Sequence, residues 1–275
     1  MNNSVRTQPV LSLELPELAP YRTLKRPVAH WQQGIFVAEG EKVVRRLLES
    51  GLEVISLLLT PDWLDTLAAT GHLAGRESLT AFLADGELLR GIVGFNVHQG
   101  IMAVARVPAE ISPEDLAPGQ LLVALDGLRI SENVGVIVRN SAAFGVQAIL
   151  VGETSCSPYL RRAVRSSMGA VFQVPVIHAS CLADLLGGLR RRYDMDVVAA
   201  DPHGGSTIYE ARLDGSACVV LGNEDYGVSA AVASLATVRA AIPMHRGTDS
   251  LNVASASAVF LYEAARQRAF RGGNA

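Results

Sequence analysis

The chain has 275 residues, 49% of them apolar, which is enough to build two domains that each have a hydrophobic core. It lacks an uninterrupted apolar run of the roughly 18 residues that a membrane-spanning helix needs. A formal net charge of −3 argues against bulk electrostatic attraction of nucleic acid, so that only local arginine clusters are suited to phosphate binding.

The first part of the chain predicts a small α/β domain over residues 1–107, which begins with a flexible arm over residues 1–20. The arm lacks the charged segment and the long apolar core of a secretion signal. Apolar residues at helical spacing predict helices, and short apolar runs predict strands. The expected helices are 38–50, one that begins at Pro61, and 78–89, and the expected strands are 54–60 and 101–107.

Residues 108–118 contain three prolines and three acidic residues between two apolar runs, which is typical of a linker. After it, residues 119–275 alternate short apolar strands with helices. This alternation predicts a parallel sheet that helices cover on both faces. The expected strands are 121–125, 148–151, 171–176, 197–200, 219–221 and 240–243, and the expected helices are 133–144, 157–168, 182–192 and one from about residue 252.

Polar segments follow several of these strands, and ligands of open α/β sheets collect at the carboxyl ends of strands. The first such segment leads into the helix that starts at Asn133. Arg139 lies two turns into this helix among apolar residues, where a charge needs either a partner or a function. A surface arginine is the alternative interpretation.

Two further segments combine a strand end with polar residues and a helix start. In the second, Gly222 directly follows a strand and would let a ligand approach the backbone closely, and Glu224 and Gly227 lead into a short helix. In the third, Ser250 and Asn252 precede a helix that is rich in alanine and serine. Either residue has a simpler interpretation as the N-cap of that helix.

Together and in this order, the three segments resemble the motifs of the SpoU family within the SPOUT class of RNA methyltransferases. The resemblance covers nearly the whole chain: residues 36–40 are similar to the family's ribosomal-protein-like substrate-binding domain, and residues 165–170 to its middle segment. The third motif is the most specific. The matching residues are Asn133, Gly135 and Arg139, then Gly222, Glu224 and Gly227, and then Ile242, Met244, Ser250, Leu251 and Asn252.

This resemblance implies a parallel α/β catalytic domain that forms a trefoil knot near the C-terminus, preceded by a small RNA-binding domain. It implies a homodimer with the C-terminal helix and the first-motif helix at the interface. S-adenosylmethionine is the implied cofactor, and a ribose 2′-hydroxyl of ribosomal or transfer RNA is the implied methyl acceptor. The backbone around Gly222, Ile242 and Leu251, with Met244 beside it, is implied to hold the cofactor.

The resemblance also implies roles for the polar motif residues. Arg139 is implied to assist removal of the hydroxyl proton. Because a guanidinium stays protonated, we equally expect it to hold the ribose–phosphate and to stabilise developing negative charge. Ser250 and Asn252 are expected to orient the hydroxyl and its loop, and Glu224 to fix Asn133 or the knot loops.

Two segments depart from the family pattern. Residues 129–132 replace a Gln-Asp-Pro or similar step, and Asp225 and Tyr226 stand where smaller residues are common. Three alternatives stay open: a catalytically silent RNA-binding protein of the same fold, an antibiotic-resistance ribosomal RNA methyltransferase, and an α/β enzyme that acts on a small molecule. Retention of the polar motif residues disfavours the silent protein, and the N-terminal domain disfavours the small-molecule enzyme.

The cysteines Cys156, Cys181 and Cys218 are widely spaced and form no disulfide or metal pattern, so we expect reduced thiols in the cytoplasm. The six histidines include no pair at metal-ligand spacing, and we expect no metal site.

Overall fold

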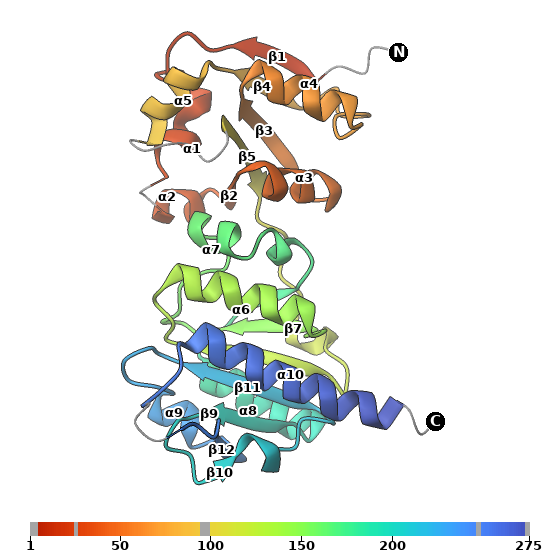
Figure 1. Cartoon of the computed structure of the whole chain (residues 1–275), viewed down its shortest axis with the longest axis vertical. Coiled ribbons are helices and arrows are strands. Elements are labelled where there is room, and N and C mark those ends of the chain that lie inside the picture. Colours follow the sequence, from red (N-terminus) through yellow and green to blue (C-terminus); the bar gives the residue numbers. More distant parts are fainter. Residues whose placement is uncertain (1–4, 25–26, 94–99, 246–248, 273–275) are drawn as a thin grey trace. The chain divides into compact units, whose positions relative to one another are not determined.

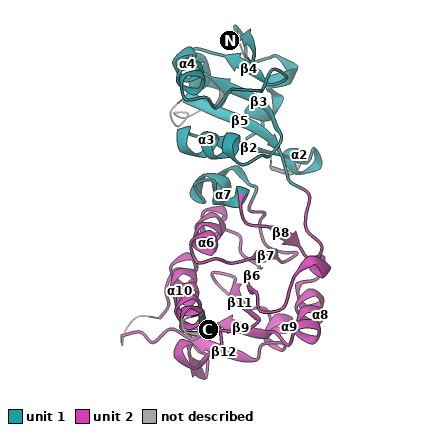
Figure 2. Cartoon of the chain, turned by 90° about the vertical axis from the view of Figure 1, so that its right-hand side faces the viewer, with its two compact units in different colours: residues 1–108, 159–172 teal, residues 109–158, 173–275 magenta. Residues whose placement is uncertain are grey.

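The computed structural model describes residues 5–24, 27–93, 100–245 and 249–272 (Figure 1). The chain divides into two compact units, one of residues 1–108 with 159–172, and one of residues 109–158 with 173–275 (Figure 2). Residues 159–172, expected in the second domain, thus group with the first unit. Each unit has a sheet of its own.

The first unit is built on a five-stranded mixed sheet with the order β1-β4-β3-β5-β2. Strands β1, β4 and β3 are parallel, and β5 runs antiparallel to both of its neighbours. The strands are β1 (Arg6–Pro9), β2 (Ile35–Glu39), β3 (Val54–Leu59), β4 (Thr80–Leu83) and β5 (Ile101–Arg106). The helices are α1 (Ala19–Arg22), α2 (Pro27–Gln32), α3 (Glu41–Glu49), α4 (Pro61–Ala69), α5 (Gly86–Val93) and α7 (Arg161–Ser166).

The expected flexible arm is wrong from residue 5 onward. Strand β1 pairs with β4, and Leu18 and Tyr21 are fully buried, with the Tyr21 hydroxyl 2.9 Å from Ser56 Oγ. The buried side chains of Val5, Val10 and Leu18 therefore anchor the arm in the core of the first unit. The first four residues of the expected arm lie outside the described residues.

Three other expectations differ from the structure, the first of them because pairing between distant strands overrides the local pattern. The expected helix over 78–89 is instead strand β4 followed by α5, because residues 80–83 pair with both β1 and β3. The expected strand over 171–176 begins as a short 3-10 turn, and only β8 (Val176–His178) pairs with β7. The expected helix over 157–168 is confined to α7.

The second unit contains a seven-stranded sheet with the order β10-β12-β9-β11-β6-β7-β8, and every pairing is parallel. Helices α6 and α10 lie on one face, and α8 and α9 on the other (Figure 2), which confirms the expected parallel α/β architecture. Its other strands are β6 (Leu121–Asp126), β7 (Ala148–Val151), β9 (Asp196–Ala200), β10 (Ser206–Thr207), β11 (Ala217–Gly222) and β12 (Val238–Ala241). Its helices are α6 (Ser131–Ala143), α8 (Leu182–Tyr193), α9 (Ala230–Ala233) and α10 (Val253–Gly272).

Strands β6 and β11 lie side by side within this sheet, and every residue of both strands is buried. Apart from Asp126 at the end of β6, these residues carry no charge, because helices cover both faces of the strands. Parallel strands also end at the same edge, so the loops after β6, β9, β11 and β12 meet there. The described helices include none that is both long and apolar enough to cross a membrane.

Candidate active site

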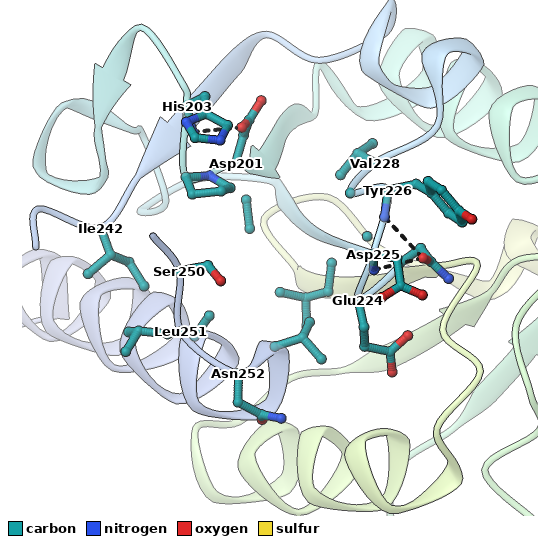
Figure 3. A pocket seen from close by; sticks show the side chains of 18 of the residues that line it. Asp201, His203, Glu224, Asp225, Tyr226, Val228, Ile242, Ser250, Leu251 and Asn252 are labelled. Atoms are coloured by element: carbon teal, nitrogen blue, oxygen red, sulfur yellow. Dashed lines mark hydrogen bonds between the residues drawn. The ribbon is translucent and has the colours of Figure 1, made fainter. Parts of the chain in front are cut away.

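A cavity of about 620 Å³ opens at this edge of the second unit (Figure 3). It is lined by the residues that follow β9, β11 and β12 and by the starts of α6 and α10. Eight of the nine residues that we expect from the sequence to act in catalysis or cofactor binding line it: Asn133, Gly222, Glu224, Ile242, Met244, Ser250, Leu251 and Asn252. The third motif segment also contains residues 246–248, which lie outside the described residues.

Three of these side chains form a hydrogen-bonded relay that connects the three motif segments. Asn133 Nδ2 donates to Glu224 Oε1 at 3.0 Å, and Asn252 Nδ2 donates to Asn133 Oδ1 at 3.1 Å. Because an ionised carboxylate only accepts, Glu224 turns the NH₂ group of Asn133 toward itself and leaves the amide oxygen for Asn252. The relay joins residues that are 91 and 119 positions apart in the chain.

Glu224 also holds the loop that precedes α6. Its two carboxylate oxygens accept the backbone N–H groups of Arg129 and Ile130, both at 3.4 Å. Together with the contact to Asn133, the carboxylate thus accepts from three donors. A carboxylate engaged in this way is suited to positioning its neighbours.

Asn252 serves as the N-cap of α10 as well as a member of the relay. Its Oδ1 accepts the backbone N–H groups of Ala254 at 2.9 Å and Ser255 at 3.4 Å. The simpler interpretation of Asn252 as an N-cap is therefore correct for its amide oxygen, while its amide nitrogen contacts Asn133. Ser250 lies at the pocket and is exposed.

Gly222 is required by the turn that follows it. A Cβ atom there would lie 2.2 Å from the backbone of both Gly227 and Val228. Asn223 and Gly227 exchange two backbone hydrogen bonds of 2.9 Å, which bring the turn back over Gly222. A glycine is therefore needed at position 222 because the chain's own backbone packs against it. Gly222 also lines the pocket, where the lack of a side chain would let a ligand approach the backbone.

Three polar residues of the pocket lie outside the three motif segments: Asp201, His203 and Arg239. Asp201 Oδ2 accepts from Arg239 Nε at 2.8 Å, and its Oδ1 accepts from the backbone N of His203 at 2.8 Å. Burial alone would raise the pKa of Asp201, but these hydrogen bonds and the Arg239 charge hold it below its usual value. Figure 3 shows Asp201 and His203 across the pocket from Asn252. Their position directly after β9 is the signal that would have found them.

Arg139 is the one predicted site residue that does not line this pocket. Its side chain is exposed on α6 and makes no hydrogen bond or ion pair with any described residue. Val136, three positions earlier on the helix, is 37% exposed. The two side chains share a solvent-facing surface of the helix. A search of the described residues finds no cluster of three or more histidine, cysteine or acidic side chains that would hold a metal.

A parallel α/β unit with a pocket at the carboxyl ends of its strands is the architecture of many small-molecule and cofactor sites. The particular family follows from comparison with known proteins: residues 120–262 match the model of the SpoU rRNA Methylase family. The chain therefore belongs to the SpoU family of RNA methyltransferases, and the resemblance of its three motifs is confirmed.

Relatives cover most of the chain. An uncharacterised tRNA/rRNA methyltransferase of Mycobacterium bovis is 33% identical over 268 residues, which cover 94% of this chain and 92% of the relative. The 23S rRNA (guanosine-2′-O-)-methyltransferase RlmB of Pasteurella multocida is 32% identical over 178 residues, 62% of this chain and 73% of the relative. The AdoMet-bound rRNA methyltransferase from Sinorhizobium meliloti is 26% identical in sequence, with a TM-score of 0.79 over 94% of this chain and 98% of that one.

Proposed function

We propose that this protein transfers a methyl group from S-adenosylmethionine to a ribose 2′-hydroxyl of ribosomal or transfer RNA. The observation that carries the proposal is the relay of Asn252, Asn133 and Glu224 at the mouth of the cavity. Membership of an RNA methyltransferase family supports it, as does the guanosine-2′-O- specificity in the name of one relative.

The cavity fits the cofactor in size and polarity. Its volume of about 620 Å³ lies within the roughly 300–1,000 Å³ of small-molecule sites. Backbone of the β11 turn and apolar side chains share its lining, which suits a ligand that carries both an aromatic base and charged groups. Gly222, Ile242, Met244 and Leu251 are the residues that we propose to hold it. The bound cofactor would supply an electrophilic methyl group on a sulfonium.

The polar residues would prepare the acceptor. A ribose hydroxyl is a poor nucleophile unless it is oriented and its proton is accommodated. Ser250 and Asn252 would orient it, and Glu224 would keep Asn133 and the loop before α6 in place. Arg139 would hold the ribose–phosphate and stabilise negative charge that develops on the oxygen.

We propose that a second copy of the chain brings Arg139 to the pocket. Arg139 does not line the pocket of its own chain and shares the exposed surface of α6 with Val136. Helix α10 packs along α6, where Asn140 Nδ2 donates to Ser257 Oγ at 2.9 Å, and α10 exposes the large side chains of Val259 and Tyr262. An exposed apolar surface on two packed helices favours a two-fold contact between copies.

The remaining assignments complete this proposal. Residues 1–107 would form the RNA-binding domain, 108–118 the linker and 119–275 the methyltransferase domain, apart from residues 159–172, which group with the first unit. The chain would be knotted, with helix α10 passing through the loop after β11. An experimental structure in which α10 does not thread that loop would exclude the knot.

The activity is tested by incubating the protein with S-adenosylmethionine carrying a tritiated methyl group and total RNA from cells that lack the gene. A 2′-O-methyl group blocks alkaline cleavage of the next phosphodiester. We therefore expect the label in alkali-resistant dinucleotides, and much less label with RNA from cells that have the gene. Label confined to bases would contradict the ribose assignment. Absence of both methylation and cofactor binding by calorimetry would favour a silent RNA-binding protein.

Mixed dimers test whether Arg139 acts in the partner's pocket. Arg139→Ala and Asn252→Asp homodimers should both be nearly inactive. A heterodimer of the two should regain roughly half of the wild-type rate, because one of its two sites then combines both intact residues. No regain would show that Arg139 does not act across the interface, and a 29.2 kDa species alone in sedimentation at micromolar concentration would exclude the dimer.

A further inference from the structure

Tyr226 is a large aromatic residue whose side chain is exposed to solvent at the opening of the pocket. It is 85% exposed although it belongs to the pocket lining. Two other exposed apolar side chains also line the pocket, Ile130 at 47% and Leu251 at 40%. The three residues come from the loops before α6, after β11 and before α10. The pocket mouth therefore has an apolar rim built from all three motif segments.

The turn that carries Tyr226 is held from several sides. Asn223 Oδ1 accepts the backbone N–H groups of Asp225 at 2.9 Å and Tyr226 at 3.1 Å. Asn223 Nδ2 donates to the carbonyl of Gly127 at 2.7 Å, which ties the turn to the end of β6. Figure 3 shows the Tyr226 ring projecting away from Ile242 and Ser250, so it leaves the interior of the pocket free. Because the backbone of the turn is already held, a partner that stacks on the ring has to order only the Tyr226 side chain.

Tyr226 also lies close in sequence to a residue that we propose to position the methyl acceptor. Glu224, two residues before Tyr226, is part of the relay that we propose to position the reacting ribose. In a nucleotide, the base is bonded to the sugar carbon next to the one that bears the 2′-hydroxyl. A base at or beside the reacting nucleotide therefore comes to the rim of the pocket. Unpaired RNA bases are commonly recognised by stacking on aromatic side chains.

We propose that the Tyr226 ring stacks on an unpaired base of the substrate RNA, at or next to the methylated nucleotide, and so positions the acceptor. This inference rests on the proposed methyl transfer to RNA and adds to it a residue that selects the substrate. Ile130 would support the same base from the loop before α6.

The experiment compares Tyr226→Ala with Tyr226→Phe and with the control Tyr209→Ala. Tyr209 is 69% exposed in the same unit but does not line the pocket. Methyl transfer is measured against the concentration of total RNA from cells that lack the gene, and cofactor affinity is measured by calorimetry. Loss of a stacked base should raise the KM for RNA about 5- to 150-fold in Tyr226→Ala, with cofactor affinity within about two-fold of wild type. Tyr226→Phe and Tyr209→Ala should behave like the wild type.

Each other outcome overturns the inference. A KM for RNA in Tyr226→Ala equal to that of Tyr209→Ala would show that the ring does not contact the substrate. A loss of cofactor affinity would place the ring in the cofactor site instead, and a changed sedimentation coefficient would place it in a contact between copies. If the wild-type protein methylates no RNA, the proposed function itself fails, and this inference fails with it.

Discussion

Asn252 makes two kinds of contact through the two ends of one amide, and substitutions separate them. Its Oδ1 caps α10, and its Nδ2 donates to Asn133. Asn252→Ala removes both contacts. Asn252→Ser keeps a capping oxygen but loses the donor to Asn133. Asn252→Asp also keeps a capping oxygen, and turns a second oxygen toward Asn133 Oδ1.

The expected stability changes follow from these contacts. Loss of an asparagine N-cap costs about 1 kcal/mol, and loss of the relay hydrogen bond costs about 0.5 kcal/mol because solvent reaches Asn252. Asn252→Ala should therefore lower the free energy of unfolding by about 1.5 kcal/mol and the melting temperature by about 3–6 °C. Asn252→Ser should lower the free energy by only about 0.5 kcal/mol. All three variants should methylate RNA about 10- to 100-fold more slowly, since Asn133 loses its orientation.

Thermal unfolding, monitored by circular dichroism, measures the loss of stability. Single-turnover methyl transfer measures the loss of catalytic rate. Cofactor affinity from calorimetry serves as the control for an intact pocket. If Asn252→Ser were as unstable as Asn252→Ala, the capping contact would not be the source of the stability. If Asn252→Asp methylated RNA at the wild-type rate, the hydrogen bond from Asn252 to Asn133 would have no part in catalysis.

Three further predictions concern single residues. Arg139→Ala should abolish methyl transfer and leave cofactor affinity nearly unchanged, because a group that acts only in the transition state contributes little to ground-state binding. Arg139→Lys should fail too, since an ammonium cannot reproduce the planar guanidinium. Near-normal methylation by Arg139→Ala would make Arg139 a structural or surface residue. Leu251→Arg should weaken cofactor binding in calorimetry by placing bulk and charge at the pocket wall, and unchanged affinity would remove Leu251 from the cofactor site. Burial, with the Glu224 charge beside it, raises the pKa of the Cys156 thiol from 9.0 to about 11. Iodoacetamide should therefore alkylate Cys156 slowly at pH 8, and rapid alkylation of the folded protein at this pH would contradict the shift. The free energy of unfolding should also fall between about pH 9 and pH 11, because the unfolded chain releases the thiol proton in this range and the folded chain retains it.

Much of the second unit could be predicted from sequence because its strands are buried on both faces. The expected strand over 148–151 coincides with β7, and the expected strand over 121–125 differs from β6 by one residue. Continuous apolar runs of this kind are typical of central parallel strands. The expectation failed over 78–89, where the apolar spacing suits a helix and only pairing with β1 and β3 makes residues 80–83 a strand.

The sequence by itself determined which residues follow each strand. It therefore sufficed to identify the three motifs and eight of the residues that line the pocket. Only the tertiary structure decided which of these residues meet. The relay connects positions 91 and 119 residues apart, and Asp201 contacts Arg239 across 38 residues, because β9, β11 and β12 end at one edge of the sheet. The order of strands in a sheet depends on long-range packing, which local periodicity does not encode. The sequence left open whether Arg139 acts at the site or is a surface arginine, and the fold exposes its side chain on α6.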